Sequence, residues 1–321
     1  MTIFIAIILV IAGLAILIGG AEVMVRGSAS IARKMGISPL VVGLTIVAFG
    51  TSAPELIVNI LAAMQGNTDL AIGNVIGSNI SNILLILGIA ALVAPLAVQK
   101  STVWKEIPLA LLAAVIVLFI GNDSIIDGVN FNAITRTDGL MLVSIFAIFI
   151  YYTFGIAKNN SKKDDDDVKI YPNSRAIVFI IIGIIGLFFG GKILVDNAIT
   201  LAQAAGLSDA LIGLTVVAIG TSLPELVTSV IAAMKKQADI AVGNIVGSNI
   251  FNVLWILGAS SLITKLPFNE KLNQDVMMNI AATIMLFTFM FIGTRHKIDR
   301  WNGALFLGMY IVYIGAIIFR N

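Results

Sequence analysis

The sequence contains no cysteine, which excludes disulfide bonds, thiolate nucleophiles and cysteine-ligated metals. Charged residues are also scarce: they make up 12% of the 321 residues, while 59% are hydrophobic. A soluble domain surrounds its apolar core with a polar surface, and about 25% of its residues are usually charged. This chain has too few charged residues for such a surface. The composition therefore favours a protein that lies in a lipid bilayer.

Long apolar runs recur along the whole chain. They repeatedly reach the roughly 20 residues that a helix needs to cross about 30 Å of hydrocarbon. We predict an all-α membrane protein with ten transmembrane helices, at residues 3–34, 38–64, 69–95, 105–121, 137–157, 174–205, 208–234, 239–263, 275–293 and 301–319. The first and sixth runs are too long for one straight crossing, so we expect those helices to be strongly tilted or curved.

The chain is also an internal duplication. A shift of 170 residues aligns residues 17–97 with 187–267 without a gap, and more than half of positions 43–88 are identical. Each half holds five predicted spans, an odd number, so the second half enters the membrane the opposite way round. We therefore predict two inverted five-helix repeats, residues 1–157 and 174–321, joined by a linker at 158–173. Corresponding residues of the two repeats should meet near the middle of the membrane.

A glutamate lies inside an apolar segment at the same point of each repeat. Residues 43–56, GLTIVAFGTSAPEL, contain Glu55, and residues 213–226, GLTVVAIGTSLPEL, contain Glu225. An ionised group in a bilayer core costs about 3 kcal/mol or more, so it is rarely there without a function. The structural alternative is a kinked helix whose acid pairs with a buried base, but neither copy has a base nearby in sequence. Both carboxylates are therefore candidate functional groups.

The residues before each glutamate supply further oxygen atoms. Proline has no N–H group, so each proline leaves the carbonyl four residues earlier without its helical partner. Such a break at membrane depth is tolerated only where it is buried in protein or faces a cavity. Carbonyl, hydroxyl and carboxylate oxygens are the hard ligands that alkali and alkaline-earth cations take. The predicted ligands and helix breaks are Thr51, Ser52 and Glu55 with Gly50 and Pro54, and Thr221, Ser222 and Glu225 with Gly220 and Pro224.

A second polar motif lies in the third span of each repeat. It reads GNVIGSNISN at residues 73–82 and GNIVGSNIFN at residues 243–252. The serine and the last asparagine of each motif are four residues apart and so share one helix face. We predict that Ser78, Asn82, Ser248 and Asn252 coordinate a cation. For Asn74, Asn79, Asn244 and Asn249, hydrogen bonding between packed helices is at least as good an explanation as ligation.

The motif pairs GTSAPEL with GSNISN and GTSLPEL with GSNIFN resemble the paired alpha repeats of the calcium/cation antiporter superfamily, in particular its sodium/calcium exchangers of the prokaryotic type. The resemblance covers nearly the whole chain. It implies an antiporter with four cation sites between the second, third, seventh and eighth helices, and a first and sixth helix that slide to alternate access. It also implies a ligand set: Glu55 and Glu225 at the centre, the carbonyls of Ala48 and Ala218, and the side chains of Thr51, Ser52, Thr221, Ser222, Ser78, Ser248, Asn82 and Asn252. One departure is the eighth span, where some relatives carry an acid at the position of Asn252.

The basic residues indicate an orientation. If the N-terminus is outside, the cytoplasmic side collects Arg33, Lys34, Lys100, Lys105, Lys158, Lys162, Lys163, Lys169, Arg175, Lys235, Lys236, Arg295, Lys297 and Arg300. The outer side keeps only Arg136, Lys265, Lys271 and Arg320. Lysine and arginine are enriched in short cytoplasmic loops. We therefore expect a multi-pass protein of the plasma (inner) membrane with both termini outside and the linker, residues 158–173, in the cytoplasm.

Three other functions are compatible with parts of this pattern. Calcium/proton exchange is the nearest, because burial disfavours the charged form of a carboxyl group and two adjacent acids could take up protons in place of sodium. A passive cation channel also uses carboxylates and carbonyls, but a single pseudo-two-fold centre argues against it. An intramembrane hydrolase is the weakest, since Ser52 and Ser222 have no nearby His, Cys or Lys in sequence to act as base.

The sequence therefore predicts a transporter and not an enzyme. We expect it to exchange sodium ions for calcium ions and to need no cofactor. Its predicted partners are the lipid bilayer and inorganic cations, with no nucleic acid and no required protein partner.

Overall fold

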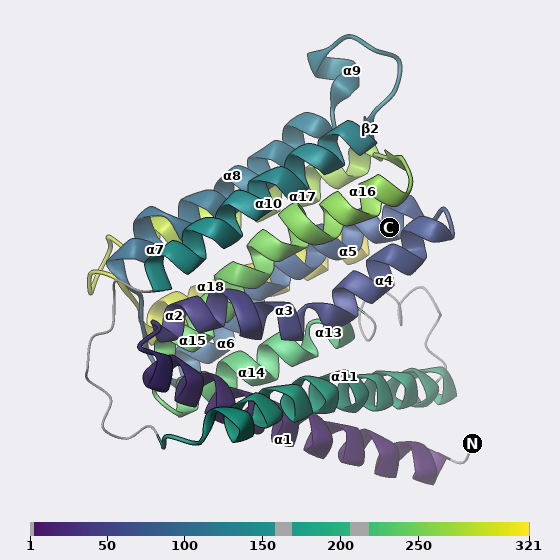
Figure 1. Cartoon of the computed structure of the whole chain (residues 1–321). Coiled ribbons are helices and arrows are strands. Elements are labelled where there is room, and N and C mark those ends of the chain that lie inside the picture. The colour runs from purple at the N-terminus through teal and green to yellow at the C-terminus, as the bar shows by residue number, and fades with distance from the viewer. Residues whose placement is uncertain (1–2, 158–168, 206–217, 321) are drawn as a thin grey trace.

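The computed structural model describes residues 3–157, 169–205 and 218–320, and this part is almost entirely helical (Figure 1). The first half contains α1 (Ile3–Met35), α2 (Pro39–Val42), the π-helix η1 (Gly43–Val47), α3 (Ala48–Thr51), α4 (Ala53–Met64), α5 (Thr68–Ser81), the π-helix η2 (Asn82–Ile86), α6 (Leu87–Val93), α7 (Lys100–Trp104), α8 (Glu106–Ile120), α9 (Asp123–Ile126) and α10 (Arg136–Ala157). The second half contains α11 (Asn173–Ala204), α13 (Ala218–Thr221), α14 (Leu223–Met234), α15 (Ala238–Ile250), the π-helix η4 (Phe251–Leu257), α16 (Gly258–Ile263), the 3-10 helix η5 (Glu270–Leu272), α17 (Asn273–Phe289) and α18 (Arg300–Arg320). The predicted all-α class is confirmed. Most of the predicted linker and the start of the predicted seventh span lie outside the described residues.

Seven helical stretches of the described chain are long and apolar enough to cross a membrane: Ile3–Met35, Thr68–Val93, Lys100–Ile120, Arg136–Gly155, Asn173–Ala204, Ala238–Ile263 and Arg300–Ile318. The pair Pro39–Thr51 and Ala53–Met64, which is bent by 47°, makes an eighth if it is counted as one span. The predicted seventh span is only partly described, and the predicted ninth span coincides with the 17-residue helix α17. The count of ten spans therefore stays a prediction.

Helices α1 and α11 are the two longest. They have 33 and 32 residues, and at 1.5 Å per residue each is about 50 Å long. This exceeds the thickness of a hydrocarbon core, so both helices must tilt or extend beyond it. Figure 1 shows them side by side along one face of the protein and running in opposite directions.

Glycines bring α1 and α11 into backbone contact. A Cβ atom added at Gly13 would lie 2.9 Å from the carbonyl oxygen of Gly190, and one at Gly183 would lie 2.8 Å from that of Gly20. Only glycine allows the two helices to approach this closely. The two contacts are related by the repeat, because Gly13 corresponds to Gly183 and Gly20 to Gly190 at a spacing of 170 residues.

Four two-residue strands, which the sequence analysis did not anticipate, connect the two halves. Strand β1 (Leu96–Ala97) pairs antiparallel with β4 (Lys297–Ile298), and β2 (Ala133–Ile134) pairs antiparallel with β3 (Leu266–Pro267). Each pair takes one strand from each half of the chain. The two pairs lie at opposite ends of α8, because β1 precedes that helix and β2 follows it.

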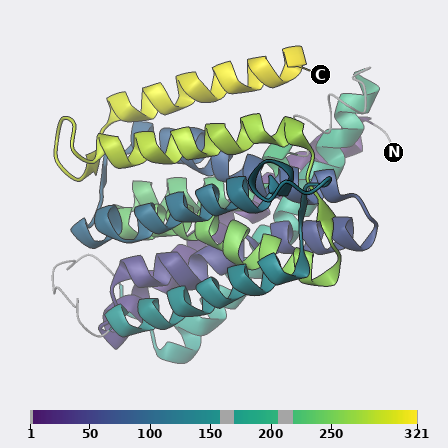
Figure 2. The ribbon, with the colours of Figure 1, turned by 90° about the horizontal axis from the view of Figure 1, so that it is seen from above.

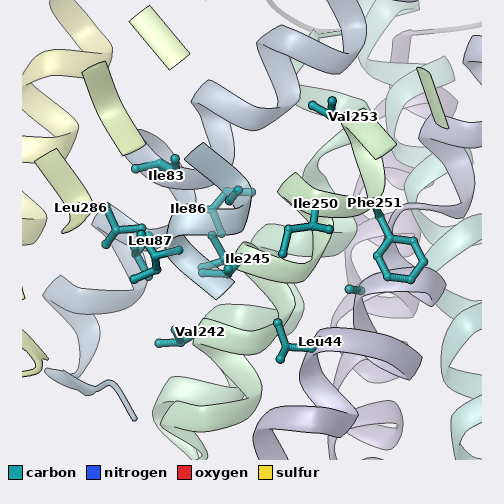
Figure 3. Close-up of a cluster of buried hydrophobic side chains, with 14 of the residues drawn as sticks. Leu44, Ile83, Ile86, Leu87, Val242, Ile245, Ile250, Phe251, Val253 and Leu286 are labelled. Carbon is teal, nitrogen blue, oxygen red and sulfur yellow. The ribbon is translucent and has the colours of Figure 1, made fainter. Parts of the chain in front are cut away.

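The third and eighth predicted spans occupy the centre of the protein. In their most apolar windows, 78% of the residues of Thr68–Val93 and 94% of those of Ala238–Ile263 are buried inside the protein, compared with 22% for α1 and 28% for α11. Apolar side chains of η2, α6, α15, η4 and η1 pack together there (Figure 3). Viewed from above, α18 lies at one edge of the molecule (Figure 2). The motif-bearing helices are therefore held in a packed interior, and α1 and α11 lie outside it.

The predicted orientation can be tested with single cysteines, because the chain has none of its own. Asn130, between α9 and β2, and Thr294, just before β4, are both exposed and lie at opposite ends of the fold. In right-side-out vesicles we expect a membrane-impermeant maleimide to label Asn130→Cys and not Thr294→Cys. Permeabilised vesicles, in which both should react, serve as the control. The opposite pattern would reverse the orientation, and equal labelling before permeabilisation would contradict the predicted number of spans between the two positions.

Candidate functional site

The two predicted glutamates occupy equivalent positions at a break in a helix. Glu55 lies in the first turn of α4 and Glu225 in the first turn of α14, and each is only 1% exposed. Ser52 and Ser222 separate these helices from α3 and α13, with φ/ψ of −85°/7° and −88°/3°. The same sequence pattern thus produces the same local backbone twice.

The breaks occur beside the two prolines of the motifs. Pro54 and Pro224 each lie in the first two positions of the helix after the break, where a missing N–H group costs least. Gly50 and Gly220 belong to the short helices before the break. Each carboxylate therefore lies beside a proline without an N–H group and a buried serine hydroxyl, inside an otherwise apolar segment.

Residues of opposite repeats meet at this break. The Ser52 hydroxyl donates to Glu225 Oε1 at 2.8 Å and lies 3.0 Å from the Ser248 hydroxyl oxygen. Glu55 and Glu225 are close enough for their charges to interact. The structure therefore brings the GTSxPE motifs and the third-span motif into one buried polar centre.

Several buried oxygen atoms of the motif residues have no hydrogen-bond partner within the described part of the chain. They are Glu55 Oε2, Glu225 Oε2, Ser222 Oγ, Asn82 Oδ1 and Asn252 Oδ1. A buried polar atom left without a partner costs about 1–3 kcal/mol. All five belong to the repeated motifs, and a cation, which needs only acceptors, would stabilise such oxygens.

The chemistry of the donor set fits hard cations such as sodium and calcium. The described residues contain no group of three or more His, Cys, Asp and Glu side chains that could hold a metal. The centre has instead two carboxylates among neutral hydroxyl and amide oxygens. Hard cations prefer such oxygen ligands, whereas zinc and copper favour nitrogen and sulfur.

The other predicted ligands are placed as follows. Ser78 is 5% exposed and Ser248 is fully buried. The Ala48 carbonyl oxygen accepts the Ser52 backbone N–H at 3.0 Å and lies 3.3 Å from the Thr51 hydroxyl. The single Thr51 hydroxyl proton goes to Asn244 at the shorter distance of 2.9 Å, so the Ala48 carbonyl keeps a lone pair for a ligand. Thr221 is half-buried at the end of α13, and Ala218 begins that helix.

Two of the remaining asparagines connect helices. Asn244 accepts from the Thr51 hydroxyl at 2.9 Å and donates to Ser229 Oγ at 2.9 Å, and Asn74 donates to Asn59 Oδ1 at 2.6 Å. These contacts support the interhelical explanation. Asn59 and Ser229 were not singled out in the sequence, although each lies four residues after a motif glutamate and so on the same helix face.

The last four asparagines form a closed group across the two repeats, which we call the amide clasp. Asn79 Nδ2 donates to the Asn249 backbone oxygen at 3.2 Å, and Asn249 Nδ2 donates to the Asn79 backbone oxygen at 3.3 Å. Asn82 Nδ2 donates to Asn249 Oδ1 at 2.9 Å, and Asn252 Nδ2 donates to Asn79 Oδ1 at 3.0 Å. Asn82 and Asn252 both lie in π-helical segments, a distortion often found at functional sites.

Comparison with known proteins identifies close relatives over the full length of the chain. The sequence matches the family described as sodium/calcium exchanger protein over residues 5–155 and 175–319. It is 34% identical over 321 residues to the inner membrane protein YrbG of Escherichia coli, covering 96% of this chain and 95% of that protein. It is 30% identical over 344 residues to the sodium/calcium exchanger MaX1 of Methanosarcina acetivorans, covering 97% of this chain and 98% of that protein. A solved structure of the sodium-calcium exchanger NCX_Mj superimposes with a TM-score of 0.84 at 34% identity, covering 98% of this chain and 100% of that one.

Removal of one charge from the centre should abolish calcium binding. Glu55→Gln and Glu225→Gln keep the side-chain size but leave a bound calcium ion with an uncompensated positive charge in a medium of low dielectric constant. A ligand at 100 times its Kd stabilises the folded protein by about 2.7 kcal/mol. We expect calcium to raise the unfolding temperature of the wild-type protein in detergent and to leave both variants unchanged.

Glu106→Gln is the matched control. Glu106 is also 1% exposed, but it begins α8 and accepts a hydrogen bond from Tyr152 at 2.9 Å, away from the two motifs. This variant should keep the calcium-induced shift. A normal shift in Glu55→Gln or Glu225→Gln would remove that glutamate from the cation site.

Proposed function

The chain belongs to the sodium/calcium exchanger protein family, and on that premise we propose that it is a secondary active antiporter that exchanges sodium for calcium at one centre between its two halves. The observation that carries the proposal is the cross-repeat contact of Ser52 with Glu225 and Ser248. It unites a carboxylate and the neutral oxygens of two repeats in one buried centre. The protein is a multi-pass membrane protein, and its function in this proposal is transport.

The number of carboxylates sets the coupling. Glu55 and Glu225 carry two negative charges, which balance one calcium ion or two sodium ions. Both cargoes use the same oxygens and so compete for them. The empty, doubly charged centre is costly to enclose in low dielectric. The carrier therefore changes its accessible side when loaded with one species or the other, and this couples the two fluxes.

The proposed ligands follow the matched motifs. Glu55 and Glu225 are the central ligands. The surrounding oxygens come from the carbonyls of Ala48 and Ala218 and from the side chains of Thr51, Ser52, Thr221, Ser222, Ser78, Ser248, Asn82 and Asn252. Five buried oxygens of these residues have no partner among the described residues, which supports this set. Sodium and calcium are cargo, and the proposal includes no cofactor.

The proposed movement is a displacement of α1 and α11 across the central helices, which alternates access to the centre. The glycine contacts between α1 and α11 support their movement as one pair, and their low burial places them at the periphery. Lys235, at the end of α14, forms an ion pair with Glu22 of α1 at 3.0 Å. The residue 170 positions before Lys235 is Gln65, which cannot form the corresponding pair with α11. The ion pair therefore has no counterpart in the other repeat, as expected if it stabilises only one of the two access states.

We also propose the architecture that the sequence predicts. Ten spans form two inverted repeats, residues 1–157 and 174–321, in the plasma (inner) membrane. Both termini are outside, and the linker at residues 158–173 is cytoplasmic. The reciprocal glycine contacts and the two cross-half strand pairs are what two repeats related by a pseudo-two-fold axis would make, and they support this arrangement.

Proteoliposomes test the function directly. Loaded with sodium and diluted into sodium-free medium, they should take up radioactive calcium, and a sodium ionophore should abolish the uptake. Uptake driven by a pH step without sodium would instead assign calcium/proton exchange. Calcium flux that is independent of any opposing gradient and far above carrier turnover would assign a channel.

The charge count predicts that potassium plays no part in the cycle. Asn252 and Asn82 offer carbonyl oxygens without a charge. A third carboxylate would leave room for a monovalent companion of calcium, but here calcium alone neutralises the two glutamates. We expect sodium-driven calcium flux to be unchanged when potassium is replaced by choline on both sides with the membrane potential clamped. A several-fold loss of flux would mean that a further charge reaches the centre.

A further inference from the structure

The amide clasp fixes which atom Asn82 and Asn252 can present to the cation centre. A side-chain amide has one acceptor oxygen and one donor NH2 group on opposite sides. Within the clasp, the NH2 group of Asn82 is bonded to Asn249 Oδ1 at 2.9 Å, and the NH2 group of Asn252 is bonded to Asn79 Oδ1 at 3.0 Å. Both side chains are 1% exposed, and both Oδ1 atoms have no partner among the described residues. The Oδ1 atoms of Asn82 and Asn252 therefore point away from Asn79 and Asn249.

Asn79 and Asn249 determine this orientation because their own amides cannot turn. Each donates its NH2 group to the backbone carbonyl of the other, at 3.2 Å and 3.3 Å. Their side-chain oxygens must therefore face Asn252 and Asn82, which can approach only with NH2. If either amide reversed, a backbone carbonyl would face a side-chain oxygen, and both would lose their donor. The orientation is thus set by hydrogen bonds to rigid backbone and not by the cation.

We propose that Asn79 and Asn249 are positioning residues for cation binding, each orienting the ligand amide of the opposite repeat. Asn79 orients Asn252, and Asn249 orients Asn82. The inference rests on the proposed function, in which the oxygens of Asn82 and Asn252 contact the cation. Without the clasp, either amide could turn its NH2 group toward the centre, where a donor would repel a cation.

The clasp also limits the charge of the centre. An ionised acid at position 252 has no proton to place between its oxygen and Asn79 Oδ1, so an acid there could bond Asn79 only in its protonated, uncharged form. Asn79 cannot reverse to offer its own NH2 group without losing its bond to the Asn249 backbone. Asn79 therefore selects an uncharged donor at position 252, which is an amide in this chain, and this selection keeps the number of ionised carboxylates at two.

Double-mutant cycles separate this role from general support of the fold. The cycles combine Asn79→Ala or Asn249→Ala with Asn82→Ala or Asn252→Ala. The measured quantities are the calcium concentration for half-maximal sodium-driven uptake and the calcium-induced shift in unfolding temperature in detergent. The unfolding temperature without calcium reports the structural effect of each change separately.

We expect Asn79→Ala to weaken the apparent calcium affinity about tenfold, the loss of roughly one hydrogen-bonded ligand. In an Asn252→Ala background, Asn79→Ala should add less than about twofold, because the ligand it orients is already gone. In an Asn82→Ala background it should again cost about tenfold, because Asn82 is bonded to Asn249. Asn249→Ala should show the reverse pairing. A purely structural role would move stability by a similar amount in all backgrounds and would not follow this crossed pattern.

The outcomes are distinct. If wild-type protein exchanges sodium for calcium but the cycles are additive in every background, or calcium affinity is unchanged in both alanine variants, the positioning role is wrong and the proposed function stands. If wild-type protein shows no exchange, the proposed function fails, and the thermal shifts still test the crossed pairing. If one single variant does not fold, the equivalent variant in the other repeat tests the same geometry, since the clasp is reciprocal.

Discussion

The burial of two carboxylates in one membrane-embedded centre is the constraint on which the rest of the structure depends. Glu55 and Glu225 are each 1% exposed and interact electrostatically. Two adjacent charges that are removed from water are unfavourable unless cations or many polar groups compensate them. The surrounding features provide such compensation: the broken helices, the serine between the two motifs, and the neutral amides beyond it.

The duplication makes it possible to build such a centre from a short sequence pattern. Each repeat supplies half of the oxygens, and the contacts cross between repeats, as Ser52 does when it donates to Glu225. Neither half contains both carboxylates. Between the halves, Asn79 and Asn249 each donate a side-chain NH2 group to the backbone carbonyl of the other, and the Oδ1 atoms of Asn82 and Asn252 have no partner among the described residues. Asn79 and Asn249 thus join the two repeats, and in our proposal they also determine that side-chain oxygens, and not NH2 groups, face the centre.

Much of this was available from the sequence because it depends on local patterns. Apolar runs predicted the helices, and the offset of 170 residues predicted the duplication. A proline before a glutamate predicted a break, and the structure places one at Ser52 and another at Ser222. The two-residue strands were missed, since a stretch as short as Leu96–Ala97 has no periodicity to detect.

The sequence by itself determined the class of the protein, its two repeats and the list of oxygen-bearing residues, since hydropathy, proline geometry and side-chain chemistry are local properties. Only the tertiary structure decided which of these residues bond to one another. It joined Asn244 to Thr51 and Ser229, and it bonded the NH2 group of Asn252 to Asn79 of the opposite repeat. The physical reason is that such bonds join residues far apart in the chain. Whether an amide faces a backbone carbonyl or a cation centre depends on how the two repeats pack, and identical motifs carry no information about that.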